Sequence, residues 1–234
     1  MNTRESNQIK PDIKPHYFKF YSLSKFGHLT IENLRENRIY AQSIFNLNDP
    51  FEGLWYDCDT NHLESAHNRE FRNRLGRSGI FSLCCSEDKY FPMNPESILL
   101  WSHYADGHKG FCIEFSEKIL NHDEFEFTPS MVKYTDALPD KDSIYPYDEY
   151  SVKDKERILY CKGQMWNYEN ELRLCFNKAN EYVEIPKGCI KAIYCGCKMS
   201  TEEIEIMKNL AKYLSVELHV LGMALDKYKF EEQI

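Results

Sequence analysis

The sequence predicts a single α+β domain, built on a mixed, largely antiparallel sheet of short strands with a few flanking helices. A chain of 234 residues suits one large domain. Short apolar or aromatic runs alternate with clusters of turn formers, and aromatic residues make up 14% of the chain, as is typical of sheet-rich proteins. Residues 1–15 are polar and contain two prolines, so we expect a flexible N-terminal arm followed by the domain over residues 16–234.

The first half of the domain is expected to alternate strands with short helices. Strands have β-branched or aromatic residues between turn formers, whereas helices show a cap or an apolar period of three to four. The expected strands are HYFKFYSL (16–23), RIYAQS (38–43), Gly79 to Ser86 and GFCIEFS (110–116). The expected helices run from Thr30 to near Asn37, through HNREFRNRL (67–75), and briefly within PESILLWSHY (95–104).

The second half begins with a segment that has no clear period. Residues 121–150 carry many Asp, Pro and Tyr residues, and we expect an insertion or a lid over a site. A helix near 152–162 follows, and a later helix over 199–215 begins with a capping box formed by Ser200 and Glu203. The expected strands are ELRLCF (171–176), YVEIP (182–186), IKAIYCG (190–196) and VELHVLGMAL (216–225).

Composition narrows the classes of function. The formal charge of −8 disfavours non-specific nucleic-acid binding, which relies on Lys and Arg to neutralise phosphates. No apolar run reaches the ~18 residues that a membrane helix needs, and no apolar signal core is visible, so we expect a cytoplasmic protein without a membrane partner. Nine cysteines without a C-x-x-C pair predict reduced core thiols, and we expect no metal.

Four segments together carry a family resemblance: YFKFYSL (17–23), FNLNDPFEG (45–53), LLWSHYADGHKGFCIEF (99–115) and MWNYENELRL (165–174). In this order they resemble a bacterial family catalogued as domain of unknown function 2971, over roughly residues 17–230. The resemblance implies a setting in bacterial phage defence or toxin systems. It assigns no reaction. The family often has an Arg in its first strand, where this chain has Tyr21.

The strand within NYENELRLCF places charged residues on one face. Alternation directs Glu169, Glu171 and Arg173 to one side and the intervening apolar residues to the other. Glu-x-Glu at the start of a late strand resembles the third motif of ADP-ribosyltransferases, and the fold is expected to be similar to theirs. That resemblance implies that Glu171 stabilises the cation formed on the ribose of NAD, while Glu169 orients or deprotonates the acceptor. The alternative is an exposed strand face with local ion pairs.

Two further motifs supply candidate site residues. In WSHYADGHKGF, His103 and Tyr104 are candidate catalytic groups; the alternative is the end of a core helix. In NLNDPFEG a simple Asx turn that closes two elements is the favoured interpretation, and the alternative is a turn that presents carboxylates to the same cleft. The residues expected to bind the ligand or line the cleft are Lys19, Tyr21, Asn48, Asp49, Glu52, Trp101, Lys109, Trp166 and Arg173.

These patterns favour a nucleotide-using enzyme. The best reading is an NAD-dependent ADP-ribosyltransferase-like protein or NAD glycohydrolase, with NAD as substrate and a macromolecule as a conceivable acceptor. One alternative is a module of a defence system that senses a nucleotide-like small molecule or binds a partner protein. Another is a metal-dependent nuclease that uses Asp49, Glu52, Glu114, Glu169 and Glu171. The chain has neither a phosphate-binding P-loop motif nor a dinucleotide-binding glycine motif.

Overall fold

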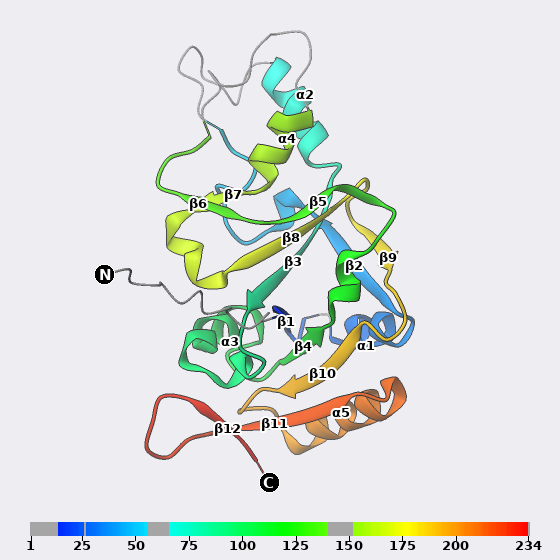
Figure 1. The fold of residues 1–234 in the computed structure, drawn as a ribbon, viewed down its shortest axis with the longest axis vertical. Helices are drawn as coiled ribbons and strands as arrows, with labels where there is room; N and C mark the ends of the chain where they lie inside the picture. Colours follow the sequence, from blue (N-terminus) through cyan, green and yellow to red (C-terminus); the bar gives the residue numbers. More distant parts are fainter. Residues whose placement is uncertain (1–13, 26, 56–65, 140–151, 234) are drawn as a thin grey trace, which may run out of the picture.

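A ten-stranded sheet forms the centre of the protein (Figure 1). The computed structural model describes residues 14–25, 27–55, 66–139 and 152–233. Most neighbouring strands are antiparallel; the pair β10 and β11 is parallel. The strands are β1 (His16–Tyr21), β2 (Arg38–Ser43), β3 (Gly79–Ser86), β4 (Phe111–Phe115), β5 (Phe125–Met131), β8 (Glu171–Phe176), β9 (Glu181–Glu184), β10 (Ile190–Cys195), β11 (Glu217–Met223) and β12 (Phe230–Glu232), while β6 (Lys133–Thr135) and β7 (Cys161–Gly163) form a separate parallel pair.

The sheet forks at β3, and this fork positions the site. One edge of β3 pairs with β8 from Gly79 to Cys84. Its other edge is shared: β2 pairs with β3 at Gly79 and Ile80, and β1 pairs with it only from Cys84 onward. Between these two pairings, residues 81–83 have no partner strand on that edge within the described chain. On one side of this stretch β1 pairs with β4, which pairs with β10. On the other side β2 pairs with β9, so a gap opens between β1 and β2.

In the described part of the chain, five α-helices and several short 3₁₀ helices surround the sheet (Figure 1). α1 (Gly27–Arg35) and α5 (Thr201–Leu214) contribute to the largest apolar core, on one side of the fork. α3 (Ile98–Tyr104) packs in a second core on the other side of β1, and α2 (Ala66–Leu75) and α4 (Val152–Leu159) share a third near β8. The short helices are η1 (Ile44–Asn46), η2 (Phe91–Met93), η3 (Pro95–Ser97), η4 (Glu117–Leu120) and η6 (Gln164–Glu169).

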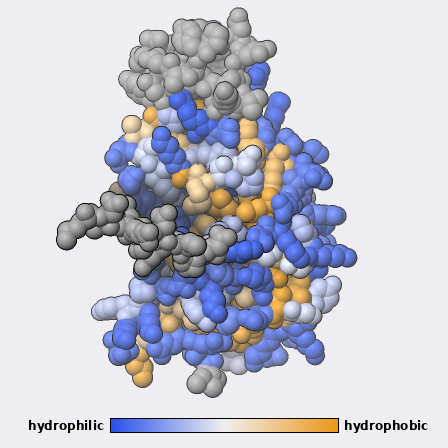
Figure 2. All heavy atoms as spheres, viewed as in Figure 1, coloured by the Kyte–Doolittle hydropathy of each residue, from blue (hydrophilic) through white to orange (hydrophobic). Residues whose placement is uncertain are grey.

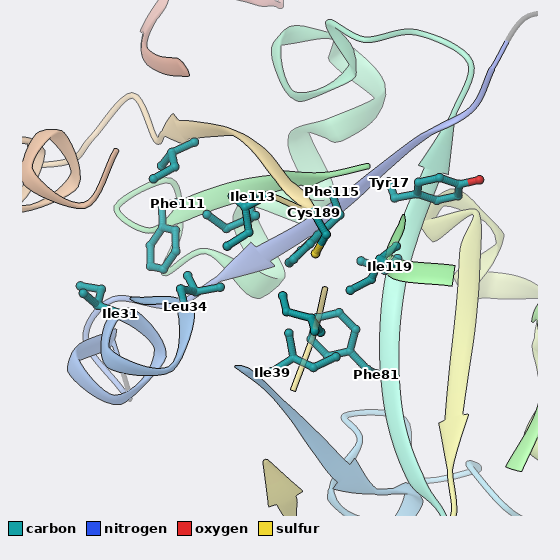
Figure 3. Packing of buried hydrophobic residues seen from close by; sticks show 14 of the residues in the cluster. Tyr17, Ile31, Leu34, Ile39, Phe81, Phe111, Ile113, Phe115, Ile119 and Cys189 are labelled. Atoms are coloured by element: carbon teal, nitrogen blue, oxygen red, sulfur yellow. The ribbon is translucent and has the colours of Figure 1, made fainter. Parts of the chain in front are cut away.

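The main core fills the space between the two arms of the fork (Figure 3). Ile31 and Leu34 reach it from α1, and Ile39 and Phe81 reach it from β2 and β3. All four side chains are buried. The β1 strand alternates between the cores: Tyr17 belongs to this one, and Phe18 to the core beneath α3. The divergence of the strands is therefore held open by packed side chains.

The predicted fold class is confirmed: the protein is a single α+β domain with a largely antiparallel sheet. The strand from Gly79 to Ser86 and the capping box of α5 lie where the sequence places them. Helix α1 begins at Gly27 rather than near Thr30. Residues 125–135, expected in an insertion or lid, form β5 and β6 instead, and β5 pairs with β8 through two register shifts. Residues 140–150 and the expected arm over 1–13 lie outside the described part.

Hydrophilic residues cover much of the face seen in Figure 2, and hydrophobic residues are exposed in patches across its middle. None of the described helices is long and apolar enough to cross a membrane. The eight described cysteines are all free thiols, as the sequence predicts, and five of them are buried.

Candidate functional site

A cavity of about 630 Å³ opens beside the gap in the sheet, on the side of α3. Its volume falls within the range of small-molecule sites. β1, β3, α3, β8 and the turn after β2 all contribute to its wall. The lining residues that carry the argument below are Lys19, Lys25, Asn48, Glu52, Ser82, His103, Tyr104, Lys162, Glu169, Glu171 and Arg173.

The floor of this cavity is a buried charge network centred on Arg173. Its guanidinium donates to Glu171 through Nε (2.8 Å) and Nη2 (3.0 Å), and to Glu52 through Nη2 (3.0 Å) and Nη1 (3.1 Å). A further bond runs from Nη1 to the Leu159 carbonyl. Because all five N–H groups of a guanidinium lie in one plane, this double fork fixes both carboxylates in place.

Lys162 joins the third carboxylate to the same network. Its ammonium donates to Glu169 Oε2 at 2.6 Å and lies 3.6 Å from Glu52 and 3.5 Å from Glu171. Every member of this group, which we call the charged floor (Glu52, Lys162, Glu169, Glu171 and Arg173), is less than one tenth exposed. The charged floor holds three acids against two bases. Its formal charge is −1 when all five are ionised.

The pKa values of Glu171 and Glu52 in the charged floor are shifted in opposite directions. Burial opposes ionisation of Glu171, but Arg173 and Lys162 outweigh it and lower the pKa of Glu171 to about 2. Burial raises the pKa of Glu52, and Arg173 offsets only part of this effect. Burial also acts against the charge of Lys162, yet the three glutamates raise its pKa. Glu171 is therefore a permanent anion at neutral pH, whereas Glu52 is the member inclined to hold a proton.

One wall of the cavity is formed by the last turn of α3. The Tyr104 hydroxyl accepts a hydrogen bond from Asn48 Nδ2 at 2.9 Å and donates a short one to Glu169 Oε1. His103, the preceding residue, is exposed, and its ring is inclined at 33° to that of Tyr168 with the ring centroids 6.2 Å apart. Tyr104 therefore couples the turn after β2 to the charged floor, and His103 offers an imidazole at the mouth.

Lys19 is one of the basic side chains that line the cavity. No described carboxylate lies within the 4.0 Å of an ion pair, although its ammonium stands 4.9 Å from the centre of the Phe81 ring. Burial lowers the pKa of Lys19 to about 8, despite the attraction of Glu171 and Glu169. A half-buried amine without a carboxylate partner is suited to binding an anionic group of a ligand.

Eight of the predicted site residues meet at this cavity, and five lie elsewhere. Trp101 is a core residue whose indole donates to the Pro92 carbonyl. Lys109 is exposed and lines no described pocket. Asp49 and Trp166 line a neighbouring pocket on the other side of Lys162. Tyr21 lines a cavity on the far side of the fork. The strand from Glu171 to Phe176 is not exposed on either face, so the surface ion-pair reading of its charges is wrong.

Sequence reasoning missed several residues of the site. Lys162 escaped notice because its strand, β7, is only three residues long and has no visible period. Lys25 and Ser82 line the cavity without belonging to any motif. Asp106 holds the rim by accepting hydrogen bonds from the Ser22 hydroxyl and from two backbone N–H groups of the following loop. Its position in A-D-G was the one usable signal, since Asp before Gly commonly marks a turn.

The carboxylates proposed for a metal site do not gather in one place. Glu114 belongs to a different cluster, where it binds His16 (2.8 Å), Lys191 (2.9 Å) and Tyr194 (3.3 Å). The contacts with His16 and Lys191 lower the pKa of Glu114 against the effect of burial. Among the described residues, no group of three or more His, Cys, Asp or Glu side chains is arranged to hold a metal ion. In the charged floor, basic groups already occupy the carboxylate oxygens.

Comparison with known proteins gives one match. No curated protein and no solved structure matches the chain significantly. A likeness to ADP-ribosyltransferases therefore has no support from a homologue or a solved fold. A family model matches one segment of the chain, which contains most of α3, all of β4 and every residue of the charged floor except Glu52. Residues 100–174 match the family described as protein of unknown function (DUF2971). This confirms the family resemblance for the motifs at 99–115 and 165–174, while those at 17–23 and 45–53 lie outside the matched range.

Proposed function

We propose that the cavity binds a nucleotide and that the protein cleaves the N-glycosidic bond of NAD, as an ADP-ribosyltransferase or an NAD glycohydrolase. The observation that carries this proposal is the carboxylate of Glu171, which stays ionised in the wall of a cavity large enough for a nucleotide. Cleavage of this bond develops positive charge on the ribose. A fixed anion in a site with little water stabilises such a charge more than water does.

The reaction assigns a role to each polar group. The bond between the ribose C1′ and the nicotinamide nitrogen breaks, and its electron pair leaves with nicotinamide. A water molecule or an acceptor nucleophile then bonds to C1′ and gives up one proton. Glu169 is the candidate base, held in place by Tyr104 and Lys162. Glu171 faces the cation, and Arg173 keeps it from turning away.

The remaining walls fit the other parts of a nucleotide. Lys19 and Lys25 supply positive charge for a pyrophosphate. The rings of His103 and Tyr104 offer surfaces for a base or for nicotinamide. The four basic and four acidic side chains that line the cavity cancel in formal charge, so the cavity as a whole does not repel an anionic ligand.

The alternative functions receive less support from the site. A metal-dependent nuclease needs free carboxylate oxygens, whereas those of Glu52, Glu169 and Glu171 accept from Arg173 and Lys162. A ligand-sensing module of a defence system would use the same cavity without turnover, so only a kinetic measurement separates it from an enzyme. The setting in phage defence stays part of the proposal.

The test is release of nicotinamide from NAD by the purified protein, with and without cell lysate. Glu171→Gln keeps the shape of the side chain and removes the anion, so the rate is expected to fall at least a hundredfold, on the order of the loss of one fixed electrostatic group. Glu114→Gln is the matched control, because Glu114 is an equally buried, ion-paired glutamate outside the cavity. Tyr104→Phe removes only one hydroxyl and serves as a second site variant.

Three outcomes decide the proposal. Release that disappears in Glu171→Gln and persists in Glu114→Gln, with both proteins folded, supports it. A stimulation by lysate indicates a macromolecular acceptor. If no nicotinamide is released under either condition but titrated NAD still binds, the enzyme proposal is wrong. The cavity is then assigned to the ligand-sensing alternative.

A further inference from the structure

A second cavity of about 410 Å³ lies on the opposite side of the fork, between α1, β2 and β9. It shares two lining residues with the first cavity, Lys19 and Gln42. Both flank the gap in the sheet: Lys19 follows the last residue of β1 that pairs with β3, and Gln42 pairs with Ile80. The two cavities therefore meet where β1 and β2 separate.

Aromatic and aliphatic side chains form the floor and part of the wall of this second cavity. Phe81 and Ile39 belong to the main core that Figure 3 shows, and they form its floor together with Leu34. Tyr40 and Tyr182 form part of the wall, with ring centroids 5.2 Å apart and planes inclined at 58°. Such surfaces suit a flat aromatic ligand.

Charge in the second cavity is of one sign. Among the residues that the structure describes, none of those lining it is acidic. Arg38 lies over the Tyr182 ring at 5.4 Å, and Lys19 lies over Phe81 at 4.9 Å. The Nε of Arg38 is buried and has no hydrogen-bond partner, while its other end pairs with exposed Glu36. An anionic ligand group would satisfy this donor and neutralise the excess positive charge.

A buried acceptor without a hydrogen-bond partner belongs to another residue that lines this cavity. Asn33 is 7% exposed, and its Nδ2 donates to the Leu29 carbonyl at 2.6 Å. This bond fixes the orientation of the amide, because a flipped amide would set two carbonyl oxygens against each other. Asn33 Oδ1 is left buried without a partner. A buried acceptor of this kind lowers stability until a donor reaches it, so a ligand N–H or O–H group would be bound there.

We propose that the second cavity is a binding site for a small aromatic anion that also carries a hydrogen-bond donor. Arg38 and Lys19 bind the anionic group, the aromatic wall holds the ring, and Asn33 accepts from the donor. The argument for this site does not rest on the proposed NAD chemistry, although both cavities are lined by Lys19. Its occupant would lie close to the Lys19 ammonium, which the first cavity also uses.

The test is calorimetric titration of the full chain with three probes. 4-Hydroxybenzoate has both features, benzoate lacks the donor, and 4-hydroxybenzamide lacks the charge. We expect 4-hydroxybenzoate to bind about threefold to tenfold more tightly than either of the others, which is the effect of one hydrogen bond or one charge. Equal binding of the three, or no binding at millimolar concentration, overturns the proposal.

Variants locate the binding in this cavity. Arg38→Gln is expected to weaken 4-hydroxybenzoate about tenfold. Asn33→Leu is expected to abolish the preference for 4-hydroxybenzoate over benzoate. Thr30→Trp fills the cavity from α1 and should remove binding, whereas Lys191→Gln removes a distant charge and should change nothing. If Thr30→Trp does not fold, Arg38→Gln and Asn33→Leu still decide. Unchanged binding in both of these variants would show that the ligand binds elsewhere, and it overturns the proposal.

Discussion

Arg173→Met is expected to cost the protein about 3–5 kcal/mol of unfolding free energy at neutral pH. Methionine has a similar length and no charge, so the change removes the guanidinium that is fully buried between Glu52 and Glu171. Loss of one partner from a buried ion pair typically costs about this amount, because the other charge stays buried alone. The lowered pKa of Glu171, which is the net effect of burial, Arg173 and Lys162, is of the same order: a shift from 4.5 to about 2 corresponds to roughly 3 kcal/mol.

The same substitution has a pH signature. In the native protein the ionised form of Glu171 is favoured, so its contribution is fully present above about pH 4.5 and is lost as the pH falls toward 2. Without the guanidinium, burial raises the pKa of Glu171. Protonation of this carboxyl then removes the free-energy cost of its buried charge in the variant. The difference in stability between native protein and variant should therefore shrink between pH 7 and pH 3.

Thermal and urea unfolding at several pH values measure both effects. For a domain of this size, a loss of 3–5 kcal/mol lowers the melting temperature by roughly 6–20 °C. Lys191→Met is the control. The Lys191 side chain is half exposed and pairs with Glu114, so its loss should lower the unfolding free energy by no more than about 1 kcal/mol. A loss for Arg173→Met below about 1 kcal/mol, or one that does not vary with pH, would refute the role given to the charged floor.

Three further predictions concern other parts of the chain. Ser200→Ala removes the capping box of α5 and should lower stability by about 1 kcal/mol, seen as a fall of about 2–4 °C in melting temperature. Gly110→Ala would set a Cβ 2.1 Å from the Tyr21 carbonyl oxygen and should cost about 3 kcal/mol or more in urea unfolding, whereas Gly107→Ala meets no atom within 4 Å and should cost only the ~1–2 kcal/mol of its positive φ. Lys19, labelled by reductive ¹³C-methylation, should titrate by NMR near pH 8; a value near that of exposed lysines would contradict its burial.

The parts of the fold that depend on local pattern were predictable from the sequence. The strand from Gly79 to Ser86 is apolar and bounded by turn formers, and it lies where predicted. The alternation in β8 correctly separated Leu172 and Leu174, which face the main core, from Glu171 and Arg173, which face the cavity. Both features follow from the two-residue period of a strand, which needs no knowledge of distant contacts.

The parts that depend on pairing between distant segments were not predictable. Lys162 takes part in the site because β7 and η6 place it against β8, and nothing in C-K-G indicates this. Trp101 was assigned to the cleft although it belongs to the core, since an aromatic residue on a short helix fits both environments equally. β5 was missed because its register with β8 shifts twice, which destroys the alternation that reveals a strand.

The charged floor also limits how the chain could be divided. Arg173 meets Glu52 across 121 residues of sequence, and β8 has one of its two neighbours, β3, before residue 100. The segment over residues 100–174 that matches the family would, if expressed alone, keep Arg173, Glu171 and Lys162 but lose Glu52, and it would leave one edge of β8 without a strand. It would leave the Arg173 N–H groups that donate to Glu52 without that partner, beside an open sheet edge. We therefore regard the matched segment as a recurring part of a larger cooperative unit, which acquires its structure only when the sequence before it is also folded.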